Sequence, residues 1–169
     1  MNWSRGSSVN KRVLPLLLLL GACAVQADTV CRIVASPELA FGQYDTLSNA
    51  PMDTLTNIRV SCERNGGPQT VTLIMRLGAG ANGSSVYDRR MRQLGGGTDH
   101  LSYGLYRDVG RSAVWGTNDN VDSVSQTISI AVPNKGMQSA TFTIYGRIPA
   151  LQDVSAGTYG DSVDITLTP

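Results

Sequence analysis

Apolar and polar residues alternate along most of the chain after the first 28 or so positions, and this alternation is the main structural signal. It is clear in "TNIRVSC" at 56–62, "QTVTLIMRL" at 69–77, "HLSYGLYRD" at 100–108, "QTISIAV" at 126–132 and "ATFTIYG" at 140–146. A period of two places every second side chain on the same face of a strand, so each segment predicts a half-buried β-strand. We find no convincing amphipathic helix, because Gly, Ser, Thr, Asn and Pro interrupt the pattern too often.

Turn signals separate these predicted strands. "ERNGGP" at 63–68 and "PNKG" at 133–136 are turn clusters, and the polar, Gly-rich stretch at 78–99 predicts an excursion with one short strand around Arg90 to Leu94. The result is about seven strands in one domain, which favours an immunoglobulin-like β-sandwich. Two sheets would then bury alternate residues between them.

The last segment, "AGTYGDSVDITLTP", also reads as a strand. Val163, Ile165 and Leu167 fall on one face, and polar residues fall between them. No further strand follows in the sequence, so the partner of one edge of this strand is an open question.

The first 27 residues have the three parts of a secretory signal peptide. Basic residues come first, an apolar run follows at 13–20 apart from Pro15, and small residues at 25–27 suit cleavage. The apolar run is too short for a stable membrane span. We therefore expect a signal peptide at 1–27 and a sandwich domain at 28–169. An alternative is lipoprotein processing before Cys23 in "LGAC", which would leave a lipid anchor on that residue.

Charge and cysteine content narrow the possibilities for the exported part. The 14 basic residues fall to 11 when Arg5, Lys11 and Arg12 are removed with the leader, against 13 acidic residues, a net charge of about −2. This balance argues against a nucleic-acid partner, and no second apolar run predicts a stable membrane span. Cys31 and Cys62 remain, and in an oxidising compartment they should form a disulfide.

Candidate catalytic and metal-binding residues are few. His100 is the sole histidine and stands at the entrance to a strand. The carboxylate pairs Asp119 with Asp122, and Asp161 with Asp164, stand among turn-forming residues, which favours a role in turns over acid–base chemistry. There is no GxSxG elbow and no CxxC. We expect a protein that is not an enzyme and has no catalytic residue, metal site or cofactor.

Several separated motifs together resemble the spore coat protein U domain family, which includes subunits of archaic chaperone-usher pili. The motifs span nearly the whole predicted domain. They are Cys31, "LAFGQYD" at 39–45, Cys62, "YGLY" at 103–106, "WG" at 115–116, "YGRI" at 145–148 and the closing "GTYGD" at 157–161.

This resemblance implies an immunoglobulin-like fold that lacks its final strand and is completed by a strand from another polypeptide. In the family a periplasmic chaperone supplies that strand first, and a neighbouring subunit replaces it at the outer-membrane usher. For this chain the resemblance implies an acceptor groove with Val163, Ile165 and Leu167 on one wall and Ile33 on the other. It also implies export through the periplasm to a pilus or coat at the cell surface or outside the cell.

One departure concerns the donor arm. Cleavage after Ala27 leaves only residues 28–30 before Cys31, fewer than the roughly ten needed to fill a groove along a strand of ordinary length. We therefore expect a subunit that accepts a strand but does not donate one, such as a terminal or tip-like subunit. The alternative is an independently folded secreted domain with lectin- or adhesin-like binding, for which the candidate stacking residues are Tyr103, Tyr106, Trp115 and Tyr145.

Overall fold

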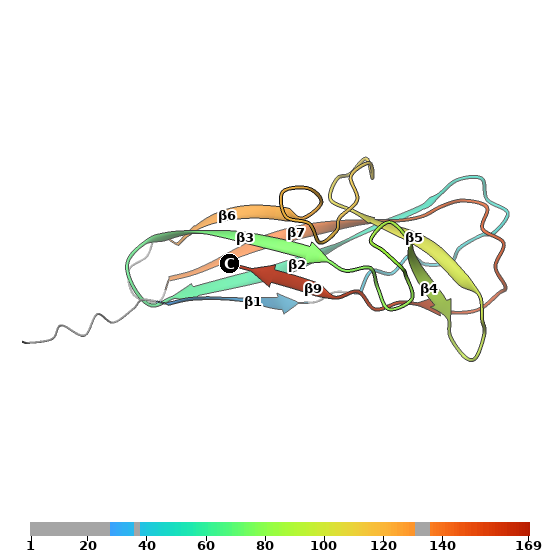
Figure 1. Cartoon of the computed structure of the whole chain (residues 1–169), viewed down its shortest axis with the longest axis horizontal. Helices are drawn as coiled ribbons and strands as arrows, with labels where there is room; N and C mark the ends of the chain where they lie inside the picture. The colour runs from blue at the N-terminus through green and yellow to red at the C-terminus, as the bar shows by residue number, and fades with distance from the viewer. Residues whose placement is uncertain (1–27, 36–37, 131–135) are drawn as a thin grey trace, which may run out of the picture.

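The computed structural model describes residues 28–35, 38–130 and 136–169. The predicted signal peptide, Cys23 and most of the "PNKG" turn lie outside the described residues. The described chain forms an elongated all-β structure without an α-helix, which confirms the all-β prediction (Figure 1). Its strands are β1 (Thr29–Ala35), β2 (Met52–Arg64), β3 (Gln69–Leu77), β4 (Arg89–Gln93), β5 (His100–Tyr106), β6 (Val124–Ile130), β7 (Gly136–Ile148), β8 (Tyr159–Gly160) and β9 (Ile165–Thr168).

The larger sheet has six strands in the order β1-β2-β7-β5-β4-β8. The long strands β2 and β7 pair antiparallel over their whole lengths, from Met52 opposite Ile148 to Arg64 opposite Gly136. β1 pairs antiparallel with β2, and Cys31 stands opposite Cys62 in the register. β1 is therefore one edge of this sheet.

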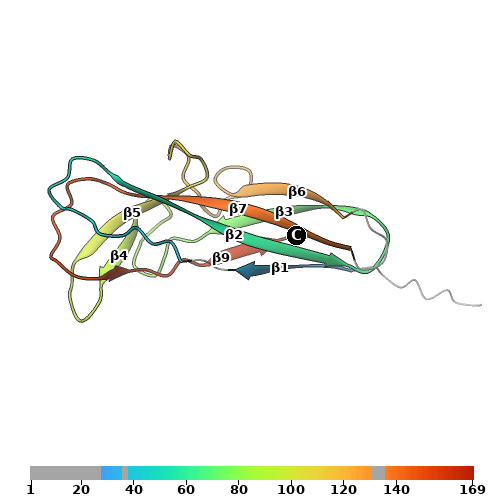
Figure 2. The ribbon, with the colours of Figure 1, turned by 180° about the vertical axis from the view of Figure 1, so that it is seen from behind.

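The smaller sheet has three strands in the order β6-β3-β9. It covers only one half of the long β2–β7 ribbon, the half where β1 also lies (Figures 1 and 2). β4 and β5 extend the other half. Segments at 38–46 and 149–158 pass over that second half, where side chains such as Leu39 and Phe41 pack against the core.

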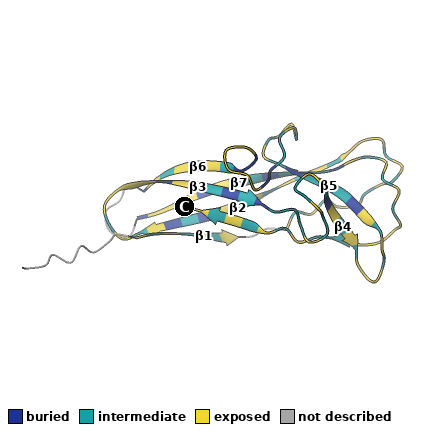
Figure 3. Cartoon of the chain, viewed as in Figure 1, coloured by how far each residue is buried: buried dark blue, intermediate teal, exposed yellow. Residues whose placement is uncertain are grey.

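The core contains the alternating residues that the sequence pattern assigned to one face of each strand. Ile58, Val60 and Cys62 of β2 are each 0% exposed. The apolar sets on β3, β5 and β7 are buried in the same way, and the buried positions of Figure 3 run between the two sheets. Burial of these side chains is the main driving force for this fold.

A disulfide joins Cys31 of β1 to Cys62 of β2, with an S–S distance of 2.03 Å. The fold therefore contains the one disulfide that was expected. The structure refines the prediction for the closing segment, which contains two short strands in place of one: β8, and then β9 from Ile165. The alternation of half-buried and exposed residues nevertheless runs through 161–168 as predicted.

Candidate functional site

One long side of the sandwich has two unpaired strand edges. Among the residues that the structure describes, β1 pairs only with β2, and β9 pairs only with β3. No backbone hydrogen bond joins β1 to β9 within the described residues. The two strands run in opposite directions along the same side of the molecule (Figures 1 and 2). Unpaired edges expose backbone donors and acceptors to any strand that can reach them.

The opposite side of the sandwich is linked. The side-chain amide of Gln126 on β6 donates a hydrogen bond of 2.8 Å to the carbonyl of Thr141 on β7, which joins the two sheets. The two long sides therefore differ, and the β1–β9 side carries the open edges.

Apolar side chains lie half-buried beside these open edges. They are Cys31 and Ile33 on β1, and Val163, Ile165 and Leu167 on or just before β9, all packed against the main core. Alternate residues, such as Val34 of β1 at 50% exposure, face solvent. The acceptor groove that the resemblance implies would lie along the surface between β1 and β9 that these five residues flank.

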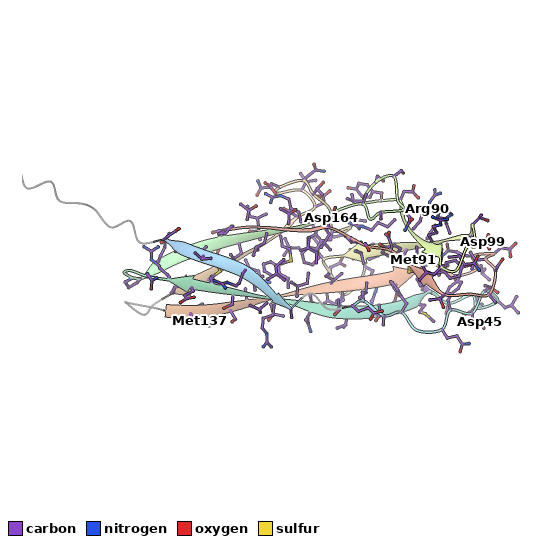
Figure 4. The ribbon with its side chains drawn as sticks, turned by 90° about the horizontal axis from the view of Figure 1, so that it is seen from below. Asp45, Arg90, Met91, Asp99, Met137 and Asp164 are labelled. Atoms are coloured by element: carbon purple, nitrogen blue, oxygen red, sulfur yellow. A yellow bond between two sulfur atoms is a disulfide. The ribbon has the colours of Figure 1, made fainter. Side chains whose placement is uncertain are left out.

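A cavity of about 370 Å³ lies near the start of β9. Its walls come from both sheets and from the segment after β1. The apolar lining includes Leu39, Phe41, Leu77, Met91, Leu105, Ile144, Val163 and Ile165. In Figure 4, Asp164 before β9 lies near the middle of the molecule, and Met91 on β4 lies closer to the end marked by Asp45, away from Met137.

The predicted groove residues occupy different parts of this region. Val163 and Ile165 line the cavity, whereas Ile33 and Leu167 do not and pack against the core elsewhere along the edges. The sequence reasoning missed Leu39 and Phe41, which close one side of the cavity. Their spacing of two residues directly after β1 was the available signal, but "LAFGQYD" was used only as a family motif.

Asp161 anchors the chain segment that leads into β9. One carboxylate oxygen accepts a hydrogen bond of 2.7 Å from the hydroxyl of Tyr103 on β5, and the other accepts bonds from the backbone N–H of Ala81 and from the Asn82 side chain. Burial, together with the hydrogen bond to Asp161, raises the pKa of Tyr103, so that its hydroxyl stays protonated and can donate. Backbone bonds of 2.9 Å from Gly78 to Asp164 and from Ala81 to the carbonyl of Ser162 continue this attachment.

Arg89, the first residue of β4, is 1% exposed and holds together the backbone segments next to the one that leads into β9. Its guanidinium donates to the backbone carbonyls of Leu77 at 3.0 Å, Gly78 at 2.8 Å, Val86 at 3.1 Å and Trp115 at 2.7 Å. Burial lowers the pKa of this guanidinium, although an arginine in a protein remains protonated. Arg89 therefore joins the end of β3 and the loop after it to the segment that carries Trp115.

The candidate catalytic residues are dispersed. His100 is exposed at the start of β5. Asp119 pairs with Arg76, whose guanidinium lowers the pKa of that carboxyl group, and Asp122 accepts hydrogen bonds from the backbone N–H and side chain of Asn118. These carboxylates hold turns and loops together, as the surrounding residue types indicated. The described residues contain no group of three His, Cys, Asp or Glu side chains that could hold a metal ion.

A second cavity, of about 580 Å³, lies over the half of the large sheet that the small sheet does not cover. Segments 38–46 and 154–159 form its walls, with Leu101 and Ile148 at its base.

Of the candidate stacking aromatics, Trp115 is only 1% exposed and Tyr103 is buried, so both belong to the core. Within the described residues, no helix has the length and apolar character needed to cross a membrane.

Comparisons with known proteins identify relatives of this sequence and fold. The model of the Spore Coat Protein U domain matches residues 18–166. Protein U of Myxococcus xanthus is 37% identical over 102 residues, covering 57% of this chain and 52% of that protein. This chain thus spans about half the length of that relative.

A search of solved structures finds a similar fold in the crystal structure of the CsuC–CsuE chaperone–tip adhesion subunit pre-assembly complex from archaic chaperone-usher Csu pili of Acinetobacter baumannii. The TM-score is 0.51 and the sequence identity is 19%. The match covers 82% of this chain and 39% of the matched chain in that complex.

Proposed function

Because the chain belongs to the Spore Coat Protein U domain family, we propose that it is a non-enzymatic subunit of a surface pilus or coat that accepts a β-strand from another polypeptide. The observation that carries this proposal is the pair of open edges on β1 and β9, with half-buried apolar side chains beside them. A strand added there gains main-chain hydrogen bonds from both edges. Its alternate side chains complete the burial of the groove residues.

The proposed partners follow from this mode of binding. A periplasmic chaperone supplies the first strand, and a neighbouring pilin or coat subunit replaces it at an outer-membrane usher, so that the assembled protein lies at the cell surface or outside the cell. Support for the chaperone step comes from the fold shared with a chain of a chaperone–subunit complex. An uncovered apolar groove beside free edges promotes aggregation, which is a physical reason for a chaperone.

We also propose that the mature protein accepts a strand without donating one. The support is the predicted cleavage after Ala27, which places three residues ahead of Cys31. Purified protein mixed with itself should then remain free of donor-strand polymers, as measured by light scattering and electron microscopy. Fibres formed by this protein alone would overturn the acceptor-only proposal without affecting the acceptor groove itself.

Expression of the full chain in a bacterial periplasm, with and without a cognate chaperone, tests the main proposal. With the chaperone, we expect a soluble, protease-resistant 1:1 complex, and without it, degradation or aggregation. A stable, protease-resistant monomer in the absence of the chaperone would favour the independently folded binding domain instead.

A matched pair of variants on β1 tests the position of the groove. Ile33→Asn changes a half-buried residue beside the open edge, whereas Val34→Asn makes the same kind of change on the exposed face of the same strand. We expect Ile33→Asn to weaken chaperone co-purification at least tenfold more than Val34→Asn. Equal recovery of both complexes would contradict the proposed groove.

The non-enzymatic assignment is also a proposal. Because His100 is exposed and separate from the groove residues, His100→Ala should leave chaperone binding and thermal stability unchanged. Loss of a surface-assembly phenotype in this variant, with a stable fold, would require a chemical or binding role for the imidazole.

A further inference from the structure

We propose that Asn65, in the turn between β2 and β3, is a site of spontaneous covalent modification, at which the side-chain amide is lost as ammonia and the residue becomes aspartate or isoaspartate. The chain contains a second Asn-Gly pair, Asn82-Gly83, which stays intact in the folded protein. This inference is independent of the proposed strand-acceptor function, because it rests on the chemistry and the surroundings of the two pairs.

The reaction needs only water. The backbone nitrogen of the glycine attacks Cγ of the asparagine, the bond from Cγ to Nδ2 breaks, and Nδ2 leaves as ammonia together with the proton of the attacking N–H. Water then opens the five-membered ring at either of its carbonyl groups. The product is aspartate, or isoaspartate, in which the main chain runs through the former side chain. Glycine favours the attack, because it has no Cβ to hinder the approach and its backbone is the least restricted.

The surroundings of Asn65 leave this reaction open. Residues 65–68 connect the end of β2 in the larger sheet to the start of β3 in the smaller one, and Asn65 is exposed. Gly66 has a φ of 151°, in the region that favours glycine. Across the described parts of the chain, no hydrogen bond holds the Asn65 side chain or the Gly66 N–H. The carboxamide can therefore turn onto the glycine nitrogen.

Asn82 is held in place. Its Nδ2 donates a hydrogen bond of 2.8 Å to Asp161 Oδ1, and its backbone N–H donates to the same oxygen at 3.2 Å. Gly83 is enclosed, since a Cβ there would lie 2.7 Å from the carbonyl oxygen of Ala79 and 3.0 Å from Cα of Arg89. Attack requires the carboxamide to rotate and lose its bond to a carboxylate. A bond of that kind shifts an equilibrium by roughly 10- to 100-fold, so Asn82 should react slower by a similar factor.

The modification also changes how β1 is attached. The Arg64 guanidinium donates from Nε to the carbonyl of Gly67 at 2.8 Å and from Nη1 to the hydroxyl of Thr29, the first residue of β1, at 2.8 Å. Isoaspartate at position 65 inserts a methylene group into the main chain between Arg64 and Gly67 and adds a carboxylate beside the guanidinium. Because a charged acceptor competes for these donors better than a neutral one, the start of β1 should be held less firmly.

Peptide mapping by mass spectrometry tests the site on the full chain, purified with any strand donor bound and incubated at neutral and at mildly alkaline pH. In the folded protein, Asn65 should be modified at least roughly tenfold faster than Asn82, and faster still at alkaline pH, where the attacking N–H loses its proton more readily. In concentrated urea the two rates should be equal, since both sites then have the same Asn-Gly chemistry. Equal rates in the folded protein, or reaction at Asn65 only in urea, would overturn the proposal.

Two variants separate the site from its protected counterpart. Asn65→Ser removes the carboxamide and should leave the turn unmodified at either pH. Asp161→Ala removes the acceptor that holds Asn82 and should raise the rate at Asn82 by roughly tenfold without changing the rate at Asn65. An unchanged rate at Asn82 in a variant that still melts cooperatively would contradict the protection assigned to Asp161. The urea comparison tests the same protection without a substitution.

Hydrogen exchange tests the effect on β1. In modified protein, the amides of residues 29–31 should exchange faster than in fresh protein, while those in the middle of β2 stay protected. Asn65→Asp is the matched control, because it adds the charge without the extra methylene group, and it should show a smaller change. Unchanged exchange at residues 29–31 would overturn the effect on β1, whereas the mapping result decides the modification site itself.

Discussion

The buried Arg89 side chain should contribute strongly to the stability of this fold, and Arg89→Lys is the substitution that tests this. The guanidinium donates to four carbonyls from three stretches of chain, at distances of 2.7 to 3.1 Å. A lysine retains the positive charge, but its single ammonium group cannot span acceptors that a planar fork reaches on several sides. The substitution therefore isolates the geometry of the hydrogen bonds from the charge.

The size of the effect follows from the number of bonds lost. If lysine keeps two of the four bonds, two buried carbonyls lose a charged donor. Hydrogen bonds to charged groups contribute about 1.5 to 3 kcal/mol each. We therefore expect the free energy of unfolding to fall by about 3 to 6 kcal/mol, a large fraction of the roughly 5 to 15 kcal/mol typical of a domain.

Arg90 provides the matched control one residue away. Its side chain is 48% exposed and pairs with Asp88 at 2.8 Å on the surface. Exposed ion pairs contribute about 0 to 1 kcal/mol, so Arg90→Lys should change stability by less than about 1 kcal/mol. The comparison keeps the chemical change constant and varies only burial and bonding.

Urea denaturation followed by tryptophan fluorescence measures the stability of both variants. A synthetic donor-strand peptide, bound to each of them throughout, keeps the proposed groove filled. Trp115 is the only tryptophan in residues 28–169, and it is buried beside the Arg89 bonds, so its emission reports on this region. The denaturation midpoint should fall for Arg89→Lys with an unchanged slope. Equal midpoints for the two variants would refute the role assigned to the buried guanidinium.

Three further predictions concern other parts of the fold. Replacing Cys31 and Cys62 with alanine should lower the free energy of unfolding by about 3 to 4 kcal/mol in the chain-entropy model, since the disulfide closes a loop with a sequence separation of 31. Chemical denaturation measures this loss, and an unchanged midpoint would argue against the contribution of the disulfide. Gly83→Ala should lower the stability of the fold by about 1 to 3 kcal/mol, because the new methyl group would meet backbone atoms, including the carbonyl oxygen of Ala79 at 2.7 Å. The methyl group of Gly67→Ala meets nothing within 4 Å, so this control should leave the melting temperature nearly unchanged. The hydrogen bonds from Arg147 lower the pKa of Asp53 in the folded protein below its ordinary 3.8. The stabilising contribution of Asp53 is therefore complete above pH 3.8, and it is lost as the pH falls through the lower pKa of the folded state. Asp53→Asn should flatten the acid side of a plot of stability against pH, and an unaltered plot would contradict this.

The period-2 pattern predicted most of the core, because whether a strand residue is buried depends on which face of the strand it occupies. Val71, Leu73 and Met75 of β3 were placed on one face by alternation alone, and all three are buried. The disulfide was predictable from export and cysteine number. The all-β class could be predicted because each strand carries its own local signal.

Arg89 and the cavity were not predictable from these local signals. Arg89 stands in the polar, Gly-rich stretch at 78–99, for which the sequence predicted only an excursion with one short strand. Its acceptors are backbone carbonyls of residues between 3 and 26 positions away. A pattern of side-chain types contains no information about such carbonyls. The cavity likewise depends on how seven strands and the segment after β1 converge, so Val163 and Ile165 were anticipated while Leu39 and Phe41 were missed.

The position of the disulfide has a mechanical consequence. β1 is an edge strand attached to the rest of the sheet only through β2, and Cys31–Cys62 makes that attachment covalent. If a partner strand binds beside β1, as we propose, and is pulled along its length, the disulfide prevents β1 from peeling away from β2 at this point. The tension would pass instead into the long β2–β7 ribbon, where the hydrogen bonds along thirteen residue pairs would be loaded together in shear.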